Sequence, residues 1–499
     1  MLVKSEISKK TNVRKQGRRI PLSLGVEKWE FMSVEVKKLI YCFMAVLLVL
    51  SSMLFSPPEG LSSQGLTMLC IALAGAFLWM TEAVGLGVTG LFIILFQAMF
   101  GILPLNQGLA FIAHPVNSVV LVGYLLAGSL VNSGMDKRIS LTIISKMGEK
   151  TSRLMLGIMI STAFLSMWMS NTATVAIMVP IATGILNMAG CKPLQSNYGK
   201  SLFIGVAFSA NIGGMGTPTG TPANPVAIAL LNNLAGIQLS FLDWTARALP
   251  VVILLLPIAW VLLRKVYPPE IDVVQGGLDA VNKQLQGLGP ISREEKRVLL
   301  LFGTAISLWL LDSFLMFLPT GWLYMVAVLL TIWIVMPKIG YLSWKESQQL
   351  IGWDVLFLVG GGLAMGAGLQ TTGAISWIAG ILANSLGNLP QLLAVLFMSG
   401  ITALGITIFC SLSGTATTFV PIAIGLAISF GWDPVLLAMT AGLSSSFAYL
   451  LPANAAPNAV SYGAGYFRTS DMAKAGVGMI FLSVLVMGFA GAFVIPLLF

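Results

Sequence analysis

The chain has 499 residues, of which 57% are hydrophobic and only 9% charged, and its mean hydropathy is +0.89. Soluble domains carry roughly 25% charged residues, so this composition excludes an ordinary soluble protein and predicts a polytopic all-α membrane protein. The single histidine and four scattered cysteines argue against a histidine-based metal site, a catalytic triad and a disulfide framework.

The chain begins with a basic segment, KSEISKKTNVRKQGRRI, ahead of its first apolar run. We interpret residues 1–38 as a cytosolic segment that sets the topology through the positive-inside rule, rather than as a nucleic-acid-binding tail. The expected location is the cell (inner or plasma) membrane, with many passes through the lipid bilayer and a cytosolic N-terminus.

Apolar segments then follow one another with one long polar interruption, at residues 264–297. This interruption carries Lys and Arg at both ends and is typical of a cytosolic loop. It divides the chain into a first half, residues 39–263, and a second half, residues 298–499.

The two halves resemble each other in three places that occur in the same order. If each half has an odd number of spans, the second copy is inverted relative to the first, which is typical of secondary transporters. The matching pairs are VLVGYLLAGSLVNSG (120–134) with LFLVGGGLAMGAGLQTTG (356–373), SNTATVAIMVPIA (170–182) with SGTATTFVPIA (413–423), and TGTPANPVA (219–227) with NAAPNAVSYG (454–463).

Each half therefore has a Ser/Thr-rich stretch followed by a Pro/Gly-rich break. A broken helix at membrane depth offers free N–H groups that hold anions and free C=O groups that hold cations. The motifs contain no Lys, Arg or His, which favours carboxylates bound together with a small hard cation such as Na⁺. The alternative is that the hydroxyls only bond back to the preceding helical turn.

Four stretches together resemble one known family, the divalent anion/sodium symporters, which are INDY-like carriers of di- and tricarboxylates. The stretches are SMWMSNTATVAIMVPIA (166–182), SGTATTFVPIA (413–423), WMTEAVGLGVTG (79–90) and GGMGTPTGTPAN (213–224). The resemblance implies about eleven transmembrane helices plus two re-entrant hairpins, arranged as two inverted repeats. It also implies scaffold and transport domains, a homodimer and an elevator-like movement.

The resemblance also implies binding residues in the first half. A first Na⁺ site would use Ser166, Ser170, Asn171 and the carbonyl of Gly220. The substrate carboxylates would meet Ser170, Asn171, Thr172, Thr221 and Pro222.

The second half departs from this pattern, because Gly414 stands where the family has Asn and Phe409 stands at the position matched to Ser166. The substrate residues expected here are Ser413, Gly414, Thr415 and Ala455, and a second Na⁺ site would rest on Leu412, Gly414 and Asn454. Loss of the Asn amide removes a ligand for a cation and a donor for a carboxylate. We therefore expect either fewer coupled sodium ions or a different substrate group.

The sequence thus predicts a Na⁺-coupled symporter of small dicarboxylates, namely succinate, malate or fumarate. The alternatives are a Na⁺-independent dicarboxylate exchanger and a sulfate carrier of the same fold. The lack of catalytic constellations disfavours an enzyme, and polarity gathered at two breaks disfavours a channel. Glu82, near a span boundary, is expected to have a structural or interfacial role.

Overall fold

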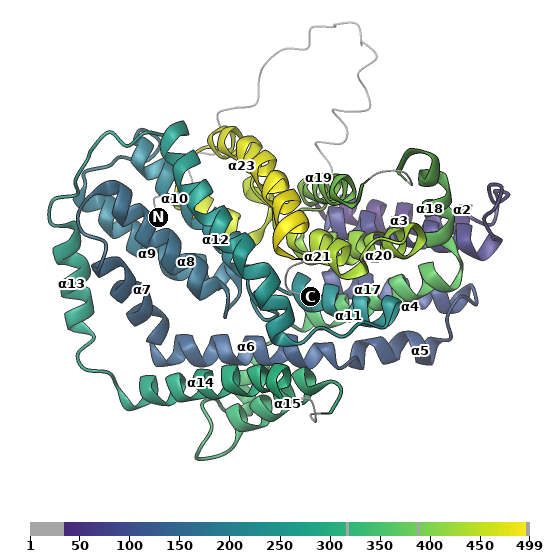
Figure 1. Cartoon of the computed structure of the whole chain (residues 1–499), viewed down its shortest axis with the longest axis horizontal. Helices are drawn as coiled ribbons and strands as arrows, with labels where there is room; N and C mark the ends of the chain where they lie inside the picture. Colours follow the sequence, from purple (N-terminus) through teal and green to yellow (C-terminus); the bar gives the residue numbers. More distant parts are fainter. Residues whose placement is uncertain (1–33, 316–318, 387–389, 496–499) are drawn as a thin grey trace, which may run out of the picture.

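A computed structural model of the chain describes residues 34–315, 319–386 and 390–495, apart from the side chains of 312–314 and 382–386. Most of the basic segment 1–38 therefore lies outside the described residues. Within them the chain is helical, and one isolated bridge joins Lys150 and Val273 (Figure 1). Up to the connecting segment the elements are α2 (Val34–Ser51), α3 (Ser63–Thr81), α4 (Leu86–Met99), α5 (Leu105–Ala110), η1 (Phe111–Ala113), α6 (Val116–Ser133), α7 (Met135–Ser145), α8 (Thr151–Ser166), α9 (Asn171–Met188), α10 (Asn197–Gly214), α11 (Ala223–Ala235) and α12 (Phe241–Val266).

The connecting segment forms one short helix of its own before the second series of helices begins. The remaining elements are α13 (Gly277–Gly287), α14 (Arg293–Phe314), α15 (Trp322–Val335), α16 (Trp344–Leu350), α17 (Trp353–Thr371), α18 (Ala374–Leu386), α19 (Gln391–Phe409), α20 (Leu412–Phe430), α21 (Pro434–Ser444), η2 (Pro452–Asn454), α22 (Ala456–Gly463), α23 (Thr469–Phe489) and the π-helix η3 (Ala490–Val494).

Eight helical segments of the described chain are long and apolar enough to cross a membrane. The family resemblance implies about eleven crossings. The difference arises partly because several apolar helices are short: α4 and α15 have 14 residues each and α21 has 11. At 1.5 Å per residue such helices are shorter than the ~30 Å hydrocarbon core of a bilayer.

Each half contains a helical hairpin with a very short turn. In the first half, α8 and α9 are joined by residues 167–170, and the Ser170 side chain caps α9 by accepting from the Ala173 N–H. In the second half, α19 and α20 are joined by Cys410 and Ser411, and Ser411 caps α20 by accepting from the Gly414 N–H. Ser at this position satisfies an N–H group that the first helical turn leaves free.

Each hairpin is followed by a helix that breaks and restarts, with an asparagine closing the break. Between α10 and α11, the Asn224 Nδ2 donates to the carbonyls of Gly214 (2.9 Å) and Thr217 (2.7 Å). Between α21 and α22, the Asn458 Nδ2 donates to those of Ala448 (2.7 Å) and Leu451 (3.2 Å). These bonds satisfy carbonyl groups that the break would otherwise leave unpaired in an apolar interior.

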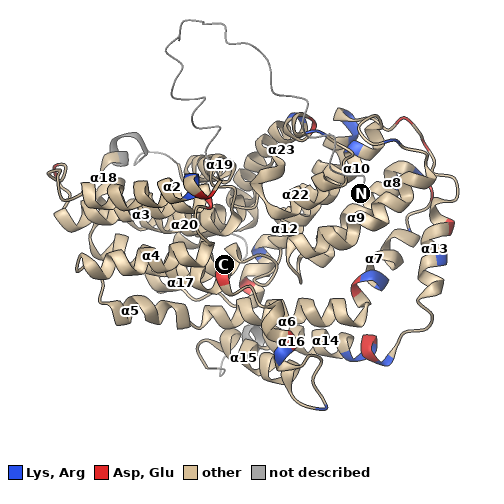
Figure 2. Ribbon diagram, turned by 180° about the vertical axis from the view of Figure 1, so that it is seen from behind, with Lys and Arg blue, Asp and Glu red and all other residues tan. Residues whose placement is uncertain are grey.

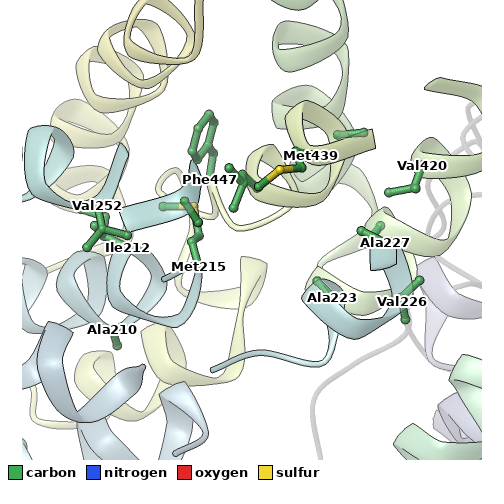
Figure 3. Packing of buried hydrophobic residues seen from close by; sticks show 14 of the residues in the cluster. Ala210, Ile212, Met215, Ala223, Val226, Ala227, Val252, Val420, Met439 and Phe447 are labelled. Atoms are coloured by element: carbon green, nitrogen blue, oxygen red, sulfur yellow. The ribbon is translucent and has the colours of Figure 1, made fainter. Parts of the chain in front are cut away.

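Apolar side chains pack on both sides of the break between α10 and α11. Figure 3 shows Ala210, Ile212 and Met215 from the α10 end gathered with Val252 of α12, while Ala223, Val226 and Ala227 of α11 lie beside Val420 of α20. The α8 and α10 backbones also approach closely, because a Cβ on Gly213 would collide with the Ala163 carbonyl. Glycine is required at this crossing, and the crossing brings the end of α8 against the end of α10.

Charged residues lie mainly at the ends of the helices and in the segments between them (Figure 2). One buried ion pair joins the first hairpin region to the connecting segment: Arg138 on α7 contacts Glu295 on α14 at 2.6 Å. The Arg138 guanidinium also donates to the carbonyls of Leu288 (3.2 Å) and Gly289 (3.1 Å). A planar guanidinium can serve all of these acceptors at once, so Arg138 fixes the end of residues 264–297 against α7.

We expect Arg138→Met to lower the free energy of unfolding by about 1–3 kcal/mol, because it leaves the Glu295 carboxylate and two carbonyls without their shared donor. Lys137→Met is the matched control, since it removes the same charge from an exposed position on the same helix. Thermal unfolding of the detergent-purified variants measures the effect. Equal midpoints for the two variants would contradict the anchoring role of Arg138.

Candidate functional site

The N-termini of four helices, α9, α11, α20 and α22, meet at one cavity of about 260 Å³. A helix N-terminus presents free N–H groups and the positive end of the helix dipole, so this convergence favours an anion. Each half contributes one hairpin tip and one helix break. The lining from these elements is Ser170, Asn171, Thr172, Gly220, Thr221 and Pro222 from the first half, and Cys410, Ser411, Leu412, Ser413, Ala455, Ala456 and Pro457 from the second.

Among the residues that the structure describes, the cavity lining carries one charged side chain, that of Glu82. Glu82 ends α3 in the left-handed conformation, with φ of 45°, and its side chain is exposed. We expected a structural or interfacial role from its position near a span boundary. An anion in this cavity would therefore be held by neutral N–H, hydroxyl and amide donors, beside a carboxylate that repels it.

A cluster of neutral oxygens lies directly behind the tip of the first hairpin. The fully buried Ser166 hydroxyl lies 2.7 Å from Asn171 Oδ1 and 2.8 Å from the Ala210 carbonyl oxygen. A hydroxyl has one hydrogen and can donate to only one of these acceptors at a time. The region therefore holds more acceptor oxygens than donors, which is the arrangement that a cation satisfies.

Two glycines allow the backbone to approach these oxygens closely. A Cβ on Gly220 would collide with the Gly214 carbonyl oxygen and lie 3.0 Å from that of Ser166, and a Cβ on Gly214 would collide with Asn171 Oδ1. The described residues contain no cluster of three or more His, Cys, Asp or Glu side chains that could hold a metal. A cation next to Gly220 would thus be bound by hydroxyl, amide and carbonyl oxygens.

The sequence comparison paired Ser170 with Ser413, but the structure matches the two hairpins in a different register. Pro180 lies ten residues after the cap Ser170, and Pro421 lies ten residues after the cap Ser411. Ser411, not Ser413, is therefore the counterpart of Ser170. In this register Leu412 stands at the place of Asn171, Ser413 at the place of Thr172, and Thr407 at the place of Ser166.

The structure accordingly brings only part of the expected second-half set to the cavity. Leu412, Ser413 and Ala455 line it, whereas Gly414 and Thr415 are buried behind it in the first turn of α20. The Gly414 N–H donates to the Ser411 hydroxyl at 3.2 Å, and the Thr415 hydroxyl donates to the Ser411 carbonyl at 2.8 Å. The letters SGT thus match SNT in sequence but lie two residues further along their helix.

A chain of buried amides joins the first hairpin to the second break. Asn171 Nδ2 donates to Asn211 Oδ1 (3.4 Å), and Asn211 Nδ2 donates to Asn458 Oδ1 (2.9 Å). Sequence reasoning missed Asn211, although an asparagine that is fully buried in the apolar helix α10 is the kind of residue that needs a partner. The chain couples the position of the first hairpin tip to that of the second half.

Broken helices around a shared cavity, in a helical protein with several membrane-spanning segments, are typical of a membrane transporter. The whole described region also matches one family model, "Sodium:sulfate symporter transmembrane region", over residues 36–499. The chain therefore belongs to that family of multi-pass membrane transporters.

The chain is also similar to named relatives along nearly its full length. It is 31% identical to the sodium-dependent dicarboxylate transporter SdcS of Staphylococcus saprophyticus, covering 94% of this chain and 93% of the relative. It is 30% identical to the SdcS protein of Staphylococcus aureus strain USA300, covering 92% of each.

Two solved structures share the fold at low sequence identity. Neisseria gonorrhoeae MtrF, described as one of a class of antimetabolite efflux pumps, has a TM-score of 0.55 at 13% identity and covers 93% of this chain and 96% of its own. The Alcanivorax borkumensis YdaH transporter has a TM-score of 0.52 at 14% identity, and the match covers 80% of this chain and 88% of the transporter chain.

We expect Gly220→Ala to weaken cation binding at least about tenfold, or about 1.4 kcal/mol, because the added methyl group would collide with the Gly214 carbonyl oxygen and displace it from the oxygen cluster. The measurement is the rise in melting temperature of the purified protein when NaCl replaces KCl. Gly184→Ala is the control, since a Cβ there meets nothing within 4 Å. A sodium-dependent rise that is the same in both variants would place the cation elsewhere.

Proposed function

We propose that the protein is a Na⁺-coupled symporter of small dicarboxylates, namely succinate, malate and fumarate. The observation that carries this proposal is the cavity onto which four helix N-termini converge, directly beside the neutral oxygen cluster of Ser166, Asn171 and Gly214. The similarity to relatives named sodium-dependent dicarboxylate transporters supports it.

The charge balance of the site explains why substrate and cation would bind together. The described cavity lining offers no basic side chain, and Glu82 adds a negative charge. Asn171 belongs to both the lining and the oxygen cluster, so a cation there is a near neighbour of the anion. Two opposite charges about 4 Å apart attract by about 4 kcal/mol at an effective dielectric constant of 20.

The symmetry of the cavity favours a substrate with two carboxylates. One pair of N-termini comes from α9 and α11, and the other comes from α20 and α22. Each pair offers free N–H groups to one carboxylate. A compact tetrahedral anion such as sulfate has a single charged centre and would engage one pair, which makes a sulfate carrier the weaker candidate.

The proposal includes the finer architecture. Residues 39–263 and 298–499 would be inverted repeats with about eleven crossings and two re-entrant hairpins. The hairpins would be α8–α9 and α19–α20, and the paired caps of Ser170 and Ser411 support their equivalence. The proposal also includes transport and scaffold domains, a homodimer and an elevator-like movement. It places the protein in the cell membrane, with the N-terminus and the loop at 264–297 in the cytosol.

The test is uptake of radiolabelled succinate into proteoliposomes, with an inward Na⁺ gradient or with K⁺ on both sides. We expect uptake only with Na⁺, and we expect Ser166→Ala to raise the half-saturating Na⁺ concentration about tenfold, because it removes a cation ligand. Ser129→Ala is the matched control: Ser129 is also buried, but its hydroxyl bonds only to the Leu125 carbonyl of its own helix at 2.8 Å.

Uptake that ignores Na⁺ but requires dicarboxylate inside the vesicles would instead show an exchanger. Uptake of sulfate in preference to succinate would contradict the proposed substrate class.

A further inference from the structure

The second half holds a polar side chain where the first half has a glycine. Asn454 lies four residues before Asn458, just as Gly220 lies four residues before Asn224, and both of those asparagines close their helix breaks in the same way. Asn454 is therefore the structural counterpart of Gly220. It is fully buried.

The Asn454 amide points at the end of α19. Its Nδ2 lies 3.3 Å from the Thr407 carbonyl oxygen, 3.5 Å from that of Ile406 and 3.7 Å from Cys410 Sγ. Its orientation is fixed, because its Oδ1 accepts the Leu451 N–H at 2.8 Å. An N–H₂ group, with its partial positive charge, thus faces carbonyls at the negative end of a helix dipole.

The first half presents the same carbonyl with no side chain to cover it. Thr407 corresponds to Ser166 in the register set by the hairpin caps, and the Ser166 carbonyl oxygen lies against Gly220, where a Cβ would be 3.0 Å from it. The second half has also exchanged an acceptor for an apolar side chain, because Leu412 stands at the place of Asn171. The first half thus has an excess of acceptor oxygens, whereas the second half has its own donor, the Asn454 amide.

We propose that the Asn454 amide permanently takes the place of a second coupling cation, so that the protein moves one Na⁺ with each dicarboxylate. This inference rests on the proposed function, since it presumes that the first-half site binds Na⁺. Two equivalent cation sites would balance the charge of a dianion. One site leaves a net charge of −1 to cross the membrane in each cycle.

The experiment compares fluxes of labelled Na⁺ and succinate into proteoliposomes, at a pH where succinate is a dianion. For the wild type we expect a flux ratio of one, a Hill coefficient for Na⁺ near one, and slower uptake when a K⁺ diffusion potential makes the lumen negative. A sodium-dependent wild type with a ratio of two and no response to potential would overturn this inference and leave the proposed function standing. Uptake that does not depend on Na⁺ would overturn both.

A double variant tests the residues themselves. Leu412→Asn with Asn454→Gly copies the first-half pair Asn171 and Gly220, and we expect its Hill coefficient and flux ratio to approach two. Leu412→Asn alone is the control, and its ratio should stay at one because the Asn454 amide still occupies the space. A double variant that transports with a ratio of one would overturn the inference. If that variant does not fold, the wild-type ratio and voltage response still decide.

Discussion

The site depends on one constraint: a helix that breaks inside an apolar environment must find partners for its free N–H and C=O groups. The two breaks solve half of this problem internally, because the Asn224 and Asn458 amides take up the carbonyls on one side. The helix starts on the other side line the cavity, together with the two hairpin tips. We propose that an anion pairs with the N–H groups that these helix starts leave free, so that the described lining needs no basic side chain.

The two halves have similar folds but differ in chemistry at the C-terminal ends of α8 and α19, the first helices of the two hairpins. Beside Gly220, the oxygens of Ser166 and Asn171 face one another with too few donors, whereas in the second half Asn454 supplies a donor of its own. A mobile cation can arrive and leave with the substrate, and a covalently attached amide cannot. We propose that the asymmetry between the halves changes the coupling rather than the fold. The chain of Asn171, Asn211 and Asn458 keeps both halves in one polar network.

Much of this was predictable from the sequence. The helical membrane protein follows from composition and from the polar motifs within apolar runs, and the family resemblance of those motifs implies the cavity positions of Ser170, Thr221 and Ala455. The register of the second hairpin did not follow, because the letters SGT outweighed the prolines at 180 and 421, which mark the same helical turn. The position of Glu82 in the cavity lining and the bonds of Asn211 did not follow, because both depend on the placing of helices distant in sequence.

The most direct test of this account is the equilibrium affinity of the purified protein for succinate, measured across a range of Na⁺ concentrations. If the cation and the anion share Asn171, Na⁺ tightens succinate binding and succinate tightens Na⁺ binding by the same factor, as thermodynamic linkage requires. A reciprocal gain of about tenfold or more corresponds to a coupling free energy of at least about 1.4 kcal/mol. Succinate affinity that is the same in Na⁺ and in K⁺ would contradict the central claim that neutral dipoles and a neighbouring cation hold the anion together.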